Sequence, residues 1–266
     1  MKKKQIVIFT DLDGTLLDKN TFKFDKIEKY FRELLSKDII IIPNSSKTEA
    51  ELSDFNKQYN LNLSFIAENG SSIHGLNLIH KNLPEKMLLS KTTDEIYKIY
   101  KQNITPYLKE KITFILNLKS KEQEEIFSLP LDKMTLAIKR NHSIPIIFNG
   151  TESEKNELIK IMNDSGLTIQ TGGRIINICG NVNKSKAISR TVELINTKIN
   201  DEIITIGVGD NQNDIEMLRH TDYACLVKND NFDSSLINIE NLIKSSEPSP
   251  EGWADVIKTA IQKIET

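Results

Sequence analysis

The sequence predicts an α/β protein with a Rossmann-like, mostly parallel open sheet as its core and an inserted α+β cap domain. Two observations predict the sheet: short apolar, β-branched runs recur near both ends of the chain, and amphipathic helical segments separate them. A third predicts the insertion, because from about residue 83 Lys- and Glu-rich helices alternate with strands. We therefore expect a core at 1–82 plus 179–266 and a cap at 83–178.

The amino-terminal third has the pattern of repeated β-α-β units. Residues 5–10 form an apolar run typical of a strand buried on both faces, and 39–42 form a second one. Between them, apolar residues from Ile27 to Leu35 recur at helical spacing, so the two strands should pair in parallel. Ser46 and Glu49 have the spacing of a capping box, which predicts another helix before a strand at 65–67.

Apolar runs and helix-capping residues also predict the elements of the cap and of the carboxyl-terminal part of the core. In the cap we expect a helix at 94–102 and another opened by Thr151 with Glu154. Cap strands are expected at 111–118, 134–139, 145–148 and 167–171. Buried-strand patterns return at 175–179 and 202–207, separated by a helix, and a last helix is expected from Trp253.

Composition limits the classes of partner. The formal net charge is −2 with both signs heavily used, so we expect no nucleic-acid or membrane-surface partner. No apolar run approaches the roughly 18 residues needed to cross a bilayer. Cys179 and Cys225 both lie in apolar stretches and are interpreted as small core residues. The expectation is a soluble, cytoplasmic protein, a monomer or weak homodimer, that acts on a small molecule.

Two aspartates follow the first strand, in Asp11-Leu12-Asp13-Gly14-Thr15. In extended geometry, residues two apart point the same way, so both carboxylates can converge at the carboxyl end of the strand. One could attack phosphorus, giving an acyl phosphate that water later cleaves, while the other handles protons. Taken alone, the same motif could be an ordinary acidic turn.

A second acidic loop argues against the interpretation of Asp11 and Asp13 as an ordinary acidic turn. Residues 207–214 follow another buried strand and contain Asp210, Asn213 and Asp214. Ligands of open α/β sheets bind at this edge, and clustered carboxylates there would repel one another unless a hard cation such as Mg²⁺ bound them. Asp214 could instead be only a helix amino-terminal acid.

Two further residues fit phosphate chemistry. Ser45, after the strand at 39–42, can donate a hydroxyl, and the helix that follows offers backbone amides to an anion. Lys184, near a helix start, can hold a phosphoryl oxygen in the transition state. Separately, Ser45 could be a turn residue and Lys184 a surface charge.

In chain order these features resemble the four motifs of the haloacid dehalogenase-like phosphatase superfamily, and the resemblance covers the whole chain. It implies that Asp11 is the nucleophile and Asp13 the general acid/base, with Ser45 and Lys184 completing the catalytic set. The metal ligands it implies for Mg²⁺ are Asp11, Asp13 through its backbone carbonyl, Asp210 and Asp214. An α+β cap between the second and third motifs is similar to the branch that includes sugar-phosphate phosphatases.

Within that branch the chain most resembles the mannosyl-3-phosphoglycerate phosphatases. The motifs that carry this are Ser45-Ser46-Lys47-Thr48, Ala67-Glu68-Asn69-Gly70, Asp222-Tyr223-Ala224, Val227-Lys228 and Pro250-Glu251-Gly252-Trp253. The resemblance implies a small phosphorylated sugar or glycerate substrate. The substrate-binding residues it implies are Ser46, Lys47, Asn69, Gly70, Arg140, Arg174 and Asn213. A guanidinium suits a glycerate carboxylate, although each Arg could be a surface residue.

The chain departs from that family in two places. Ile175-Ile176-Asn177 follows Gly172-Gly173-Arg174, where an aromatic or His-containing sequence is expected, and the loop 141–145 lacks an expected acid. The sugar is therefore the open point. Alternative substrates are sucrose phosphate, glucosyl-3-phosphoglycerate or a hexose phosphate. Alternatives of another class are a phosphomutase, or a sugar-phosphate-binding protein without activity, for which a catalytic carboxylate should be missing.

Overall fold

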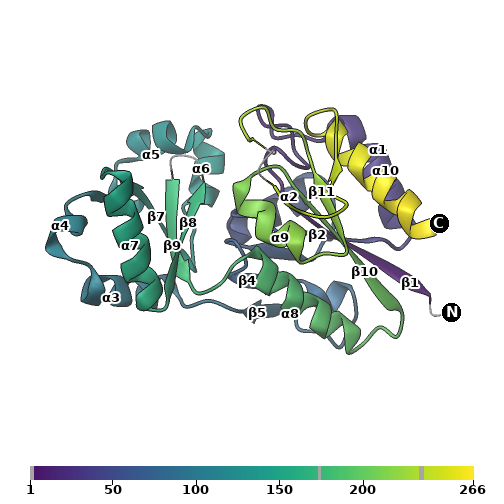
Figure 1. Ribbon diagram of the computed structural model, residues 1–266, viewed down its shortest axis with the longest axis horizontal. Helices are drawn as coiled ribbons and strands as arrows, with labels where there is room; N and C mark the ends of the chain where they lie inside the picture. The colour runs from purple at the N-terminus through teal and green to yellow at the C-terminus, as the bar shows by residue number, and fades with distance from the viewer. Residues whose placement is uncertain (1–2, 173–174, 234–236) are drawn as a thin grey trace.

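A five-stranded parallel sheet of order β12-β11-β10-β1-β2 is the centre of the larger part of the molecule, which also carries both termini (Figure 1). The computed structural model describes residues 3–172, 175–233 and 237–266. The strands are β1 Lys4–Thr10, β2 Ile40–Pro43, β10 Glu202–Gly209, β11 Tyr223–Leu226 and β12 Ile243–Lys244. Because all five run in parallel, their carboxyl ends meet at one edge. The predicted fold class, α/β with a parallel sheet, is confirmed.

Both faces of this sheet are covered, which explains the continuous apolar strands. On β1, Ile8 packs on one side with helices α1, α2 and α10, whereas Val7 and Phe9 pack on the other with α8 and α9. Burying each such side chain contributes about 1.5–3 kcal/mol. The helices are α1 Glu28–Ser36, α2 Glu49–Gln58, α8 Lys184–Asn196, α9 Ile215–Arg219 and α10 Glu251–Glu265.

A small antiparallel sheet leads out of the core. It consists of β3 Phe65–Ala67, β4 Ser72–His74 and β5 Lys86–Leu88, and a single parallel bridge between Asn44 and Ile66 joins it to the region after β2. Residues after β5 lead into the second part of the molecule.

The second part is built on a four-stranded antiparallel sheet of order β6-β7-β9-β8, beside the core in Figure 1. Its strands are β6 Ile112–Phe114, β7 Ser143–Phe148, β8 Leu167–Gly172 and β9 Ile175–Gly180. Helices α3 Thr93–Asn103 and α7 Glu152–Asp164 cover one face through an apolar cluster that includes Ile96, Leu158 and Ile178. We call this part the cap.

The predicted division at 82/83 and 178/179 stays a prediction. At the first boundary, β5 pairs with β4 and so extends the small sheet beyond residue 82. At the second, β9 keeps its register with β8 as far as Gly180.

Three local predictions were wrong. The strand expected at 134–139 is the helix α6 Leu131–Ala137, whose buried residues Met134 and Ala137 lie three apart. The strand expected at 111–118 ends at Phe114 and continues as a 3-10 turn. The remaining cap helices are α4 Pro106–Lys109 and α5 Ser120–Phe127.

The third wrong prediction is the capping box before α2. The box uses Thr48 and Glu51, with Glu51 N–H donating to Thr48 Oγ1 at 3.1 Å and Thr48 N–H to Glu51 Oε2 at 2.8 Å. The helix begins two residues later than predicted because the Lys47 carbonyl accepts the Glu68 N–H at 2.8 Å and is not free to join the helix. This delay leaves Ser46 and Lys47 in the loop at the sheet edge.

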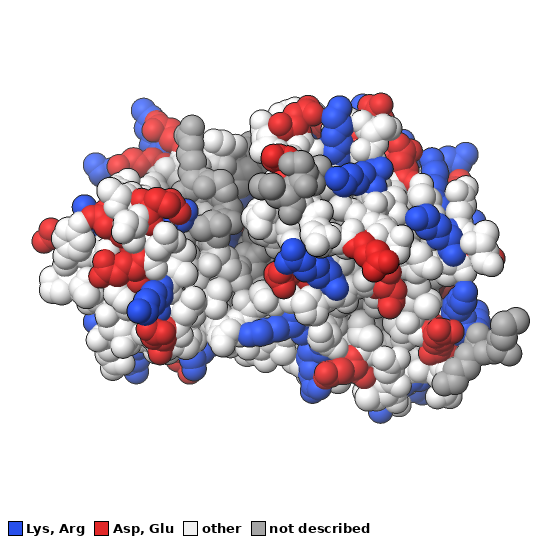
Figure 2. Space-filling model, viewed as in Figure 1, with Lys and Arg blue, Asp and Glu red and all other residues white. Residues whose placement is uncertain are grey.

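The visible surface carries both charge signs interspersed, without a single-sign field (Figure 2). Among the described helices, none is long and apolar enough to cross a membrane.

Candidate active site

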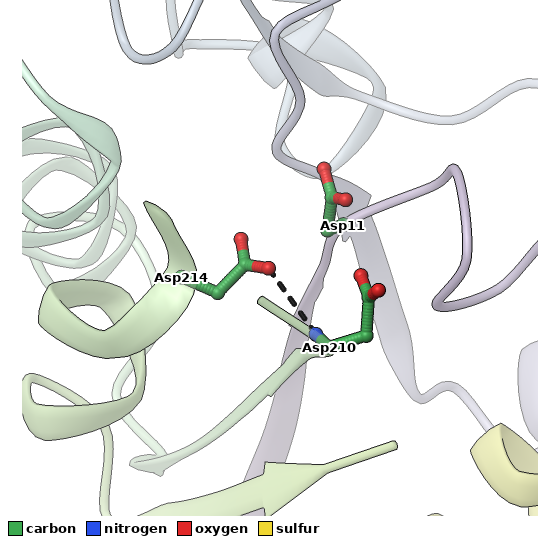
Figure 3. A group of neighbouring side chains, drawn as sticks. All are labelled: Asp11, Asp210 and Asp214. Carbon is green, nitrogen blue, oxygen red and sulfur yellow. Dashed lines mark hydrogen bonds between the residues drawn. The ribbon is translucent and has the colours of Figure 1, made fainter. Parts of the chain in front are cut away.

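Three aspartates from distant parts of the chain meet at the carboxyl edge of the central sheet. Asp11 directly follows β1, Asp210 follows β10, and Asp214 opens α9. One carboxylate oxygen from each lies within 4.8 Å of the other two (Figure 3). β1 and β10 are paired neighbours, and the Asp11 N–H donates to the Val208 carbonyl at 2.9 Å. The sheet register therefore fixes the separation of these two acids.

Uncharged groups hold Asp210 and Asp214 in place. Thr15 Oγ1 donates to Asp210 Oδ1 and Asn229 Nδ2 to Asp210 Oδ2, both at 2.7 Å. Asp214 Oδ2 accepts the backbone N–H groups of Asp210 and Asn211 at 3.2 and 3.3 Å. Partners of this kind orient ligand carboxylates before any ion arrives.

Lys184 supplies the positive charge of the cluster. Its Nζ lies 2.7 Å from Asp11 Oδ1 and 2.7 Å from Asp214 Oδ1, and its side chain is 3% exposed. Burial alone would lower the pKa of Lys184, but the two carboxylates outweigh burial and raise it. Lys184 is therefore a permanent cation beside Asp11. The Asn183 side chain caps α8 by accepting the Lys186 N–H, which places Lys184 at the first helical position.

The crowded acids make the site suited to a cation. Burial raises the pKa of Asp210 to about 7, and the nearby Asp11 and Asp214 carboxylates add to the effect. Burial also raises the pKa of Asp214 against the opposing effect of Lys184. A hard divalent ion takes carboxylate oxygens as ligands and removes this repulsion. The donor set thus fits an ion such as Mg²⁺.

Asp13 occupies a different environment from Asp11. Its Oδ2 lies 2.7 Å from Lys47 Nζ, while its Oδ1 is buried without a hydrogen-bond partner. Burial raises the pKa of Asp13, and Lys47 opposes that rise. Lys47 also lies 3.6 Å from Glu51; burial would lower the pKa of Lys47, but Asp13 and Glu51 raise it. The side chain of Asp13 is directed to Lys47, so it does not join the three-aspartate cluster.

Ser45 and Gly70 are both buried, and neither lines the cavity between core and cap. Ser45 is 2% exposed, its N–H donates to the Ile66 carbonyl at 3.1 Å, and its carbonyl accepts the Asn69 N–H at 2.9 Å. Gly70 has φ +98°, and a Cβ there would lie 2.2 Å from the Asn183 carbonyl oxygen. Only glycine lets this loop approach the start of α8 so closely. Gly70 thereby sets the position of Lys184.

A cavity of about 420 Å³ lies between the core and the cap. Of the residues expected in the site, those that line it are Asp13, Ser46, Lys47, Asn69, Arg140, Lys184 and Asn213. Asp11, Asp210 and Asp214 form the cluster beside Lys184. Arg174 lies outside the described residues.

Several polar residues of the site were not found from sequence. Thr168, Gln170 and Asn177 line the cavity from the cap sheet, and Gln170 and Asn177 are direct cross-strand partners. Their alternation with the apolar residues packed under α3 and α7 was the available signal. Asn229 could have been found as a polar residue just beyond the carboxyl end of a buried strand.

Comparisons with known proteins agree with this geometry. The family model for haloacid dehalogenase-like hydrolases matches residues 8–256. The chain is 28% identical to a glucosyl-3-phosphoglycerate/mannosyl-3-phosphoglycerate phosphatase of Persephonella marina, over 98% of each chain. It is 30% identical to the protein of the same description from Methanococcoides burtonii, over 97% of each. A solved structure of a Streptococcus mutans protein, 22% identical, has a TM-score of 0.67 and covers 96% of this chain and 98% of its own.

Proposed function

Because this chain belongs to the haloacid dehalogenase-like hydrolases, we propose that it hydrolyses mannosyl-3-phosphoglycerate to mannosylglycerate and phosphate through an aspartyl phosphate on Asp11. The family match and the named phosphatase relatives identify the chain as a phosphoric monoester hydrolase. The observation that carries the mechanism is the buried Asp11–Lys184–Asp214 arrangement beside Asp210, next to a cavity shared by core and cap. Full-length relatives named for this substrate support the choice of ester.

The chemistry is assigned to two aspartates. A carboxylate oxygen of Asp11 attacks phosphorus, the P–O bond to the glycerate oxygen breaks, and Asp13 gives that oxygen its proton. Asp13 then takes a proton from water, which attacks phosphorus, breaks the bond to Asp11 and releases phosphate. A raised pKa keeps more of Asp13 protonated for the first step. Lys184, 2.7 Å from Asp11, stabilises the negative charge that develops on the phosphoryl oxygens.

The residues that would hold Mg²⁺ are Asp11, Asp210 and Asp214, with Thr15 and Asn229 orienting Asp210. When bound, the ion neutralises phosphate charge and so lets an anionic nucleophile approach. The Asp13 carbonyl is proposed as a further ligand by family resemblance.

The cavity offers different chemistry to the two ends of the ester. Lys47 and Arg140 suit the glycerate carboxylate, and Arg140 Nε is buried without a hydrogen-bond partner. On the cap sheet, Gln170 and Asn177 are uncharged and can both donate to and accept from sugar hydroxyls. Asn177 Oδ1 is likewise buried without a partner.

A phosphate-release assay over a substrate panel tests this proposal. The panel contains mannosyl-3-phosphoglycerate, glucosyl-3-phosphoglycerate, sucrose phosphate and a hexose phosphate, with Asp11→Asn protein as the blank. We expect the highest kcat/KM for mannosyl-3-phosphoglycerate. Glucosyl-3-phosphoglycerate is the second candidate, since relatives are named for both esters. Equal, weak rates on all four, or an isomerised sugar phosphate in place of free phosphate, would contradict the proposal.

A further inference from the structure

We propose that Glu68 is a positioning residue: it fastens the cap to the core and, through Ser143, aims Arg140 into the cavity. Glu68 follows β3 in the core and is 1% exposed. Its substrate-dependent consequences rest on the proposed function, whereas the contacts themselves do not.

Three consecutive cap residues donate hydrogen bonds to this one carboxylate. The Asn141 N–H reaches Glu68 Oε1 at 2.9 Å and the His142 N–H reaches Oε2 at 3.2 Å. The Ser143 hydroxyl also donates to Oε2. Within the described residues, no Lys, Arg or His side chain forms an ion pair with Glu68 at 4.0 Å or less. These three hydrogen bonds therefore compensate for the burial of the Glu68 carboxylate. Because all three donors belong to the cap, the carboxylate is satisfied only when cap and core are in this arrangement.

Glu68 also determines the direction of the next hydrogen bond. A hydroxyl has one proton, and that of Ser143 is used toward Glu68. Ser143 Oγ must then accept from Arg140 Nη1, 3.0 Å away, and the same Nη1 donates to the Ser46 carbonyl at 3.3 Å. The guanidinium is held between core and cap while its Nε remains without a partner. Glu68 thus fixes the side chain that we expect to meet the substrate carboxylate.

The contact lies beside both chain connections between core and cap. The Asn141 carbonyl accepts the Thr93 N–H at 2.9 Å, and His142 Nδ1 lies 3.1 Å from the Lys91 carbonyl oxygen. On the return connection, the Gly180 N–H donates to Ser90 Oγ at 3.2 Å. Fixing residues 140–143 at this point sets the angle of the cap over the cavity.

The direct test is Glu68→Gln, which keeps the shape but puts an amide NH₂ opposite a donor. We expect kcat/KM for mannosyl-3-phosphoglycerate to fall about 10- to 100-fold, mainly through KM, as for a lost charge-assisted hydrogen bond. For p-nitrophenyl phosphate, which has no carboxylate, the change should stay within about twofold. Glu85→Gln, at an exposed glutamate directly before β5, is the matched control and should change neither. Equal losses on both substrates would overturn the positioning role.

A second measurement separates this proposal from the proposed function. Hydrogen exchange of the peptide covering 138–144 should be faster in Glu68→Gln than in the wild-type protein, because one of the two amides bound by Glu68 loses its acceptor and the other keeps only an uncharged one. Ser143→Ala should weaken mannosyl-3-phosphoglycerate hydrolysis too, and the double variant should be less than additive. If hydrogen exchange of this peptide is the same in Glu68→Gln as in the wild-type protein, the contact between Glu68 and the cap is ruled out. If the wild-type protein hydrolyses only p-nitrophenyl phosphate, the proposed substrate is wrong. The hydrogen-exchange measurement still tests the Glu68 contact in that case.

Discussion

Asp11 and Asp13, two positions apart in the sequence, have separate partners, and we propose separate chemical roles for them. Asp11 lies beside the buried Lys184 ammonium and the acids that would hold a metal ion. Asp13 faces Lys47, and burial raises its pKa. Carboxyl groups whose environments differ in this way are suited to nucleophile and proton-transfer roles on one site.

The pKa of Asp210 predicts how metal binding depends on pH. Without metal, a pKa of about 7 leaves Asp210 mostly protonated at pH 6 and mostly ionised at pH 8. Mg²⁺ needs the ionised form, so its affinity should be roughly tenfold weaker at pH 6 than at pH 8. Isothermal titration calorimetry of the metal-stripped protein measures this. Equal affinity at the two pH values would mean that Asp210 is not a ligand.

The same shift has a consequence for folding stability. The pKa of Asp210 in the folded protein is above its ordinary value of 3.8, so protonation favours the folded state. That contribution is present at low pH and is lost as pH rises through about 7. Mg²⁺ should therefore raise the melting temperature more at pH 8 than at pH 6. A larger rise at pH 6 would contradict the sign of this linkage.

Strands and helices differed in how well the sequence predicted them. The buried runs that became β1 and β10 were found because a strand covered on both faces is continuously apolar, and they placed Asp11 and Asp210 at one edge. The helix α6 was mistaken for a strand, since its seven residues are too few to show a helical period clearly.

The start of α2 was misplaced for a tertiary reason. Ser46 with Glu49 and Thr48 with Glu51 both have capping-box spacing, and the hydrogen bond from Glu68 to the Lys47 carbonyl favours the later start. Such a contact, between residues 21 positions apart in the sequence, cannot be predicted from local spacing. Cap contacts of Glu68 and Arg140 escaped prediction for the same reason.

Substitution of Gly209, the last residue of β10, tests whether the site needs the close approach of β10 to Asp214 at the start of α9. A Cβ there would lie 2.3 Å from the Asp214 Cβ, so Gly209→Ala must displace Asp214, which pairs with Lys184 at 2.7 Å. We expect a loss of about 1–3 kcal/mol in the free energy of unfolding and weaker Mg²⁺ binding. Chemical denaturation and metal titration measure the two effects.

Gly166→Ala is the matched control for that substitution. Gly166 has φ +74°, and a Cβ there would have no neighbour within 4 Å, so alanine there strains only the backbone. It should lower stability while leaving metal affinity and kcat unchanged. If Gly209→Ala behaved like Gly166→Ala, the packing of Asp214 against β10 would not matter for the site.

Across the molecule as a whole, the reactive groups belong to the core, whereas all but Lys47 of the groups proposed to select the substrate belong to the cap. The aspartate cluster and Lys184 come from the core, whereas Arg140, Gln170 and Asn177 line the neighbouring cavity from the cap. The sequence indicated the core chemistry because motifs at strand ends are local. It left the sugar open because the cap face is assembled from β8, β9 and the loop before β7.

The proposed mechanism requires that Asp11 become phosphorylated in a metal-dependent step. Rapid quenching of the enzyme with mannosyl-3-phosphoglycerate and Mg²⁺, followed by mass spectrometry of its peptides, tests this directly. We predict a phosphoryl group on Asp11, absent after chelation and absent in the Asp11→Asn protein, which should remain folded. Phosphate release at the wild-type rate without this modification, or a phosphoryl group on another residue, would rule out Asp11 as the nucleophile.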